Sequence, residues 1–171
     1  MLAAKSVVGA DATTNEQFQA SSQSDYYRAN ELSIDAFGSA SMGKYSIEDL
    51  SRTRVSHDTR LGAGLGVNYF FNRYLGLGVD AYSEDSRGSF VDSASANLTV
   101  RLPLGQSGFA PYAFGGGGRQ FELARTWFGQ FGAGMEYRFT RNIGVFIDAR
   151  LVVPAETGEY GLARLGLRVA F

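Results

Sequence analysis

The last eight residues of the chain, RLGLRVAF at positions 164–171, alternate between two kinds of side chain. One face is wholly apolar and ends on an aromatic residue: Leu165, Leu167, Val169 and Phe171. The opposite face carries Arg164 and Arg168. A period of two residues predicts a β-strand with two unlike faces. Which face points inward decides the fold, because a soluble barrel would bury the apolar face and expose the arginines.

The same alternation recurs through most of the chain from Glu31 onward. Besides the terminal strand, it marks seven segments: 31–41, 60–71, 74–83, 90–104, 109–121, 126–140 and 143–153. Each is near the ~9–11 residues that a tilted strand needs to cross a bilayer. The pattern predicts an all-β fold, a closed antiparallel eight-stranded transmembrane up-and-down β-barrel.

The connections between these segments alternate in length. Short turns are expected at 72–73 and 141–142, and longer loops at 45–59, 84–89, 122–125 and 154–159. The link 103–107 is longer than a two-residue turn. An even number of strands places both termini on one side and the longer loops on the other.

Composition supports one domain and excludes several function classes. The chain has 171 residues, a net charge of −1 and no cysteine, which argues against nucleic acid as a partner and excludes disulfides and thiolate metal sites. No run approaches the ~20 apolar residues of a transmembrane helix. Residues 1–30 are predicted to form a polar tail before a barrel at 31–171. Because Met1–Lys5 does not form a complete signal peptide, we expect export by a signal absent from this sequence.

Charge segregation indicates which face is inside. The apolar faces of the segments carry essentially no charge, as expected next to lipid, where an arginine costs up to ~2–4 kcal/mol at mid-depth. The other face mixes charges with glycine and with Phe37, Phe70, Tyr74, Phe128 and Phe146, which is typical of a narrow interior. In segment 109–121 the run Gly115–Gly118 hides the pattern, and we favour Tyr112 and Phe114 on the apolar face with Arg119 opposite.

Almost all positive charge is arginine, since Lys5 and Lys44 are the only lysines. Arginine in place of lysine suggests guanidinium groups held in fixed pairs with carboxylates. Buried charges must be paired, so we predict an ion-pair network inside the barrel, with the excess arginine near a mouth. Its predicted members are Glu31, Asp35, Arg60, Asp80, Arg101, Glu136, Arg138, Asp148, Arg150, Arg164 and Arg168.

Aromatic residues gather at the strand ends. At the turn ends we expect one membrane girdle: Tyr69, Phe70, Phe71, Tyr137, Phe139 and Phe171. At the loop ends we expect a second: Tyr82, Phe90 and Trp127. Two such bands mark the two membrane–water interfaces.

With its two-faced strands, alternating connections and terminal aromatic, the chain from Glu31 to Phe171 resembles the OmpA/OmpX-type outer-membrane β-barrel family. The chain departs from OmpA by ending at the barrel. The resemblance implies residence in the outer membrane of a Gram-negative-type bacterium and a porin-like barrel. It also implies that Leu165, Leu167, Val169 and Phe171 form an assembly signal for the barrel-insertion machinery. Its implied partners are outer-membrane lipids, lipopolysaccharide and proteins bound through the loops.

The expected role is structural or interactive, without a cofactor and without enzymatic activity, and four alternatives stay open. The glycines at 62, 64, 66, 76 and 78 could leave water pockets for a small ion channel. A soluble lipocalin-like carrier would invert the two faces. A lipid-modifying enzyme could use His57, although adjacent Ser56 and Asp58 do not make a triad. Acidic loop residues could bind Ca²⁺ or a lipid headgroup, with solvated surface charge as the default: Glu48, Asp49, Glu84 and Asp85. Gly115–Gly118 lacks the lysine and helix of a phosphate loop, so we interpret it as strand.

Overall fold

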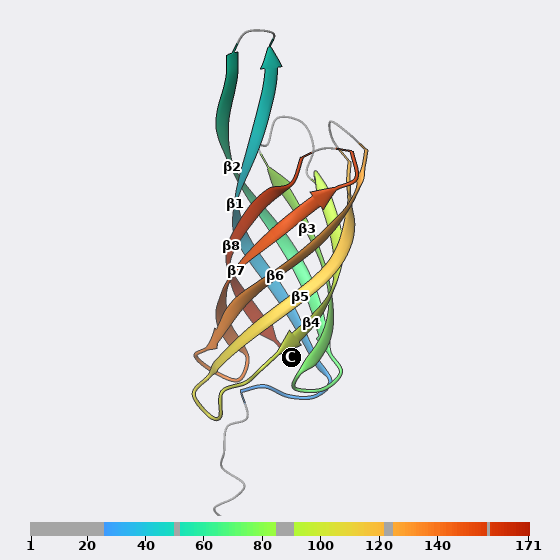
Figure 1. Ribbon diagram of the computed structural model, residues 1–171. Coiled ribbons are helices and arrows are strands. Elements are labelled where there is room, and N and C mark those ends of the chain that lie inside the picture. Colours follow the sequence, from blue (N-terminus) through green and yellow to red (C-terminus); the bar gives the residue numbers. More distant parts are fainter. Residues whose placement is uncertain (1–25, 50–51, 85–90, 122–124, 157) are drawn as a thin grey trace, which may run out of the picture.

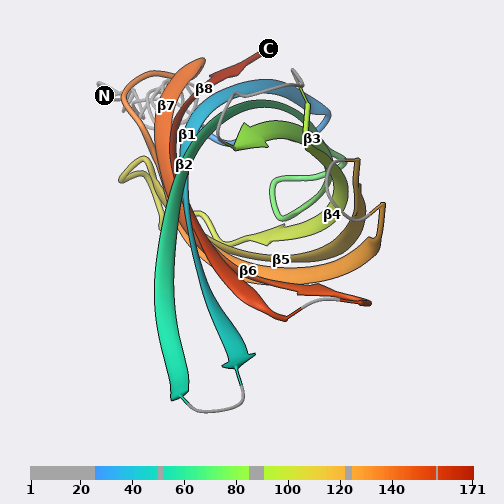
Figure 2. The same ribbon diagram turned by 90° about the horizontal axis from the view of Figure 1, so that it is seen from above.

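The computed structural model describes residues 26–49, 52–84, 91–121, 125–156 and 158–171 (Figure 1). Of the residues in strands, 44–49, 52–59 and 84 are described by their backbone only. The described residues form eight antiparallel strands that close into one barrel, which confirms the predicted fold class. Figure 2 looks along the barrel axis and shows this ring. The strands are β1 (Glu31–Asp49), β2 (Arg52–Phe70), β3 (Leu75–Glu84), β4 (Ser93–Arg101), β5 (Phe109–Gln120), β6 (Trp127–Arg138), β7 (Ile143–Pro154) and β8 (Tyr160–Ala170).

The first and last strands close the barrel. β1 pairs with β8 from Ser33↔Ala170 to Gly43↔Tyr160. The described N-terminal segment and the C-terminus lie at the same end of the barrel (Figure 1), which we call the terminal end, with the loop end opposite. No helix in the described part of the chain is long and apolar enough to cross a membrane.

Side-chain oxygens stabilise the tight turns at the terminal end by accepting hydrogen bonds from backbone N–H groups of the turns. The Asn72 side-chain oxygen accepts hydrogen bonds from the backbone N–H groups of Tyr74 and Leu75, both at 2.8 Å. The Thr140 hydroxyl accepts one from Ile143 N–H at 3.0 Å. Asparagine and threonine favour turns because their side chains can bond the backbone locally.

The predicted long loop at 45–59 is wrong. β1 and β2 continue pairing as far as Asp49↔Arg52, so their hairpin extends beyond the other connections at the loop end (Figure 1) and leans away from the axis (Figure 2). In this stretch polar residues fall on both alternating sets of positions, so no apolar face reveals the strands in the sequence.

The apolar faces point outward and the charged faces inward. Aliphatic side chains such as Leu65 and Leu165 are 65% and 64% exposed, whereas Glu31 and Glu136 are fully buried. This arrangement contradicts the alternative of a soluble carrier, whose apolar face would line the interior.

Three predicted placements are wrong. Tyr112 and Phe114 point into the barrel and Arg119 points outward, because the alternation continues through the glycine run of β5. Tyr74 precedes β3 and is 48% exposed, so it does not line the interior. Phe70 and Tyr82 are both 1% exposed and lie inside rather than in the girdles, which for Phe70 confirms the alternative prediction of a place on the inner face.

Each large interior ring lies directly opposite a glycine on a neighbouring strand. Bulky rings fit because the glycine beneath each has no side chain. These cross-strand pairs are Phe37↔Gly64, Phe70↔Gly76, Tyr82↔Gly64, Phe114↔Gly132, Tyr112↔Gly134, Phe128↔Gly118 and Phe146↔Gly166. The rings of Phe37 and Phe70, together with the Asn68 side chain, fill the space over Gly64, Gly76 and Gly78, so these three glycines leave no room for the water pockets of a channel.

The glycine pairs predict an asymmetry between two neighbouring positions of β2. A Cβ atom at Gly64 would lie 2.6 Å from the Phe37 ring and 2.5 Å from the Ala81 carbonyl oxygen, whereas at Gly66 the nearest atom is 3.4 Å away. Gly64→Ala should lower the free energy of unfolding by about 1–3 kcal/mol because the interior is already full. Gly66→Ala is the matched control and should change it by less than about 1 kcal/mol. Urea titration of the barrel in micelles, read by heat-modifiable gel migration, measures both; equal stability of the two variants would contradict the packing.

Candidate functional site in the barrel interior

Two clusters of charged side chains occupy the interior. The terminal cluster contains Glu31, Asp35, Arg101, Glu136, Arg138 and Arg168, and the middle cluster contains Asp80, Asp148, Arg150 and Arg164. Each cluster holds as many arginines as carboxylates. Charge balance within each cluster lets these groups stay ionised away from water.

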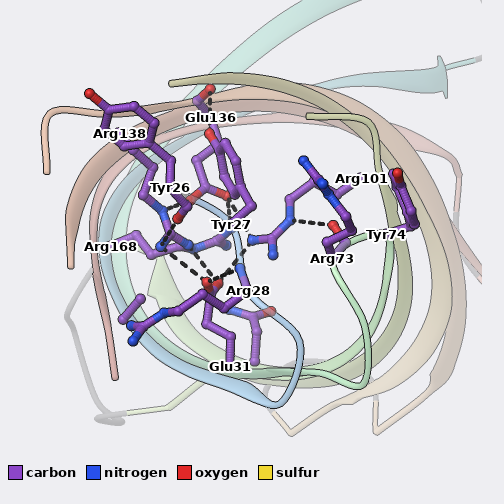
Figure 3. Close-up of polar contacts among 12 residues, drawn as sticks. Tyr26, Tyr27, Arg28, Glu31, Arg73, Tyr74, Arg101, Glu136, Arg138 and Arg168 are labelled. Carbon is purple, nitrogen blue, oxygen red and sulfur yellow. Dashed lines mark hydrogen bonds and ion pairs between the residues drawn. The ribbon is translucent and has the colours of Figure 1, made fainter. Parts of the chain in front are cut away.

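In the terminal cluster two glutamates share three arginines (Figure 3). Glu31 pairs with Arg138 at 2.7 Å and with Arg101 at 3.0 Å. Glu136 pairs with Arg168 at 2.6 Å, with Arg138, and with Arg101 at 3.8 Å. The side chains of Glu31, Glu136, Arg101 and Arg138 have no exposed surface. Strands β1, β4, β6 and β8 are thereby joined across the lumen.

Arg168 also bonds Asp35 through two of its three guanidinium nitrogens. Nε donates to Asp35 Oδ1 and Nη2 donates to Oδ2, each at 2.7 Å. This two-pronged geometry matches a guanidinium fork to a carboxylate and is among the strongest ion pairs in proteins. It links the first strand to the last.

The middle cluster repeats this arrangement farther toward the loop end. Arg164 makes a two-pronged pair with Asp148 at 2.9 and 2.7 Å and reaches Asp80 at 3.3 Å. Arg150 lies 3.5 Å from Asp80 and donates to the Gln130 side-chain oxygen at 3.0 Å. Ser95 and Asn97 donate to Asp80 at 2.8 and 3.1 Å. The carboxylates of this cluster are therefore occupied by donors.

Aromatic rings cover the faces of the interior arginines. Arg101 lies 3.7 Å from the centroid of Phe70, and Arg164 lies 4.5 Å from that of Phe37. Arg150 lies 4.8 Å from the centroid of Phe114. A guanidinium bonded at its edge and stacked on its face is shielded from water, and cation–π attraction strengthens where water is excluded.

Tyr27 closes the terminal end of the lumen. Its ring lies 4.5 Å from the Arg101 guanidinium and 4.9 Å from that of Arg138, and its hydroxyl donates to the Gly108 carbonyl at 2.7 Å. The backbone oxygen of Tyr26 accepts from Arg138 at 3.2 Å (Figure 3). Burial raises the pKa of the Tyr27 phenol, so it stays a neutral donor. Residues 26–30, expected within a tail, therefore contact the barrel.

The other candidates are placed as follows. Arg60 lies on β2 outside both clusters, at a partly exposed position, and makes an interaction of its own there. The side chain of His57 lies outside the described residues, as do those of Glu48, Asp49, Glu84 and Asp85. In the described part, no group of three or more histidine or acidic side chains is arranged to hold a metal ion.

Sequence reasoning missed three interior rings: Tyr27, Tyr112 and Phe114. Tyr27 precedes the first alternating segment, so no periodicity marks it. Tyr112 donates to Asp148 at 2.9 Å but lies in the segment whose pattern the glycines hide. Counting two-residue steps back from Gln120, on the assumption of an unbroken strand, would have found it.

Replacing Glu136 tests how much the charge balance of the terminal cluster contributes to the stability of the barrel. Glu136→Gln leaves three arginines facing two carboxylates in a buried cluster, which should lower the free energy of unfolding by about 3–5 kcal/mol. Glu156→Gln, at an exposed loop position, is the matched control and should change it by less than about 0.5 kcal/mol. Urea-induced unfolding in lipid vesicles measures both; a loss below 1 kcal/mol for Glu136→Gln would contradict the role given to this cluster.

Several solved structures of outer-membrane barrels have a similar fold. The N-terminal β-barrel domain of Pseudomonas aeruginosa OprF is similar, with a TM-score of 0.62, 18% identity, and coverage of 84% of this chain and 99% of that one. Neisserial surface protein A is similar at a TM-score of 0.62 and 15% identity, covering 82% and 97%. Ail of Yersinia pestis, in complex with the heparin analogue sucrose octasulfate, reaches 0.53 at 14% identity, covering 84% and 99%. At these identities the likeness shows the fold alone.

A search of curated proteins finds no match. Residues 9–171 match the family described as outer membrane protein beta-barrel domain, which confirms the resemblance to small outer-membrane barrels. The chain therefore belongs to the outer membrane protein beta-barrel domain family, with a buried ion-pair network in its lumen.

Proposed function

We propose that this protein is a non-enzymatic, non-conducting barrel of the outer membrane that stabilises the envelope or presents its loop end to partners. The observation that carries the proposal is the filled interior. The terminal cluster, the middle cluster and the interior rings occupy the lumen, and Tyr27 lies across its terminal end. Eight strands leave an interior just wide enough for side chains, so little space remains for a conducting path.

Orientation follows from the connections. In outer-membrane barrels the short turns face the periplasm and the longer loops face outward. The tight turns near Asn72 and Thr140 lie at the terminal end, and the long β1–β2 hairpin lies at the loop end. We therefore place the hairpin outside the cell.

The exposed aromatics support the proposed membrane position. At the terminal end the ring centroids of Tyr69 and Phe71 are 5.4 Å apart. The Tyr137 ring lies 4.5 Å from that of Phe109 and meets that of Phe139 edge to face at 5.0 Å. Aromatic rings at this depth anchor barrels at the headgroup level. Trp127, 66% exposed, stands at the loop end, while Phe90 lies outside the described residues.

Conductance tests the filled lumen. The folded protein, reconstituted in a planar bilayer at 1 M salt, should show no discrete current steps, because ions meet paired charges with no continuous water path. Heat-modifiable gel migration of the same sample establishes that the barrel is folded. Reproducible steps from a folded barrel would contradict the proposal in favour of a channel.

The hairpin separates the two roles. Replacing residues 45–56 with Asn-Gly keeps all β1–β8 pairs, which end at Gly43, and should leave barrel stability unchanged within about 0.5 kcal/mol. In a strain lacking the protein, the shortened chain should restore detergent resistance but not cell-surface attachment. A hairpin of equal length made of glycine and serine is the second variant. Full restoration by both variants would leave only the structural role.

Phe171 tests the proposed assembly signal of the last strand. Its ring is 61% exposed, and its backbone N–H bonds Leu32 O at 2.8 Å, a contact that does not need the ring. Phe171→Ala should therefore reduce the amount of barrel assembled in cells several-fold, while the purified, refolded barrel loses less than about 1 kcal/mol. Phe139→Ala, 56% exposed at the same end, is the control. Equal assembly of the two variants would contradict the signal.

A further inference from the structure

Arg119 breaks the segregation of charge in this barrel. Among the strand side chains that the structure describes, it is the one charged group on an outward face. The five arginines of the interior clusters all pair with carboxylates, whereas no carboxylate of the described residues lies within ion-pair distance of Arg119. An unpaired guanidinium on the outer wall needs a different explanation.

The depth of Arg119 identifies its surroundings. It shares the outward face of β5 with Phe109, whose ring belongs to the terminal-end girdle. From Phe109 to Arg119 a strand tilted by about 35–45° rises about 25 Å along the barrel axis, which is the height of the apolar band of such barrels. Arg119 therefore lies at the opposite interface, where an outward arginine costs only about 0–1 kcal/mol. The orientation argued above makes this the outer leaflet.

A second arginine and two aromatic rings surround this position. Arg119 pairs across the strands with Trp127, and its guanidinium lies 5.6 Å from the indole ring. The hydrogen bond from Gln120 N–H to Thr126 O, 3.0 Å, continues the pairing and brings Phe121 opposite Arg125. All four outward side chains are exposed, and we call them the rim patch: Arg119, Phe121, Arg125 and Trp127.

On the membrane side of the rim patch, the outward positions of the strands carry small side chains or none. Gly117 and Gly129 lie opposite each other one outward step below Arg119 and Trp127, and Ala96 lies beside Gly117 on β4. A Cβ atom at Gly129 would meet no other atom within 4 Å, so the space beside the backbone is open. An acyl chain below a headgroup at the rim patch can therefore approach the strands closely.

The two arginines of the rim patch favour an anion as its ligand. Asp92 lies beside the patch, where its carbonyl oxygen accepts a hydrogen bond from Phe121 N–H at 2.8 Å, and its carboxylate accepts one from the Ser83 hydroxyl at 3.2 Å. Arginine forks bind phosphate with two parallel hydrogen bonds, and tryptophan favours the membrane interface. We propose that the rim patch binds the phosphate group of an outer-leaflet lipid headgroup, with Arg119 and Arg125 as its ligands.

The single tryptophan of the chain, Trp127, reports on the rim patch directly. Adding bisphosphorylated lipid A to the folded barrel in dodecyl maltoside micelles should change its fluorescence in a saturable, salt-sensitive way. The double variant Arg119→Gln/Arg125→Gln should raise the half-saturation concentration about 25-fold, about fivefold for each guanidinium removed. Lipid A lacking both phosphates should bind like the double variant binds the intact lipid.

The control removes equal charge at the other end. Arg73 stacks on Tyr74 at 5.5 Å and Arg141 lies in an exposed turn, so Arg73→Gln/Arg141→Gln should keep the half-saturation concentration within twofold of the wild type. Heat-modifiable migration checks that every variant is folded. Unchanged affinity in the rim-patch variant would overturn the proposal, and so would an equal response to inorganic phosphate alone. Neither result depends on whether the lumen conducts.

Discussion

Charge pairing inside a space closed to water is the constraint on which this barrel depends. An unpaired buried ion costs several kcal/mol, so five arginines can line the lumen only if five carboxylates face them. The sequence spreads these partners over β1, β3, β4, β6, β7 and β8. Several pairs therefore join strands that are not neighbours in the chain, as Arg101 on β4 does with Glu31 on β1. The same contacts that satisfy the charges fill the lumen.

Glycine makes this density possible in a narrow barrel. Where a ring such as Phe146 enters the interior, its cross-strand partner, Gly166, has no side chain, and the ring lies over the bare backbone. The rings then cover the faces of the arginines, so that packing and electrostatics reinforce each other. A glycine, the aromatic ring packed over it and the arginine stacked on that ring therefore act together as one structural unit.

The sequence predicted the barrel, its facing and the interior charges because each depends on a two-residue period that lipid and lumen impose on every strand. It failed where that period carries no signal. Glycines hid the facing of Tyr112, and polar residues on both sets of alternating positions hid the strands of the long hairpin. The sequence also could not predict which charges pair. Glu136 meets Arg168 because strand tilt and register determine which strands face each other across the lumen.

The pair between Asp35 and Arg168 has a consequence for how the barrel closes. The outer face of β1 and β8 carries only apolar residues where the two strands pair, so a slip of two residues between them would leave the lipid-facing surface almost unchanged. The same slip would set Asp35 opposite Gly166 or Ala170. Asp35 and Arg168 would then be separated from each other in an interior closed to water. The register between β1 and β8 is thus selected by the interior and not by the lipid: several registers would present the same apolar surface to the membrane, but only one pairs Asp35 with Arg168.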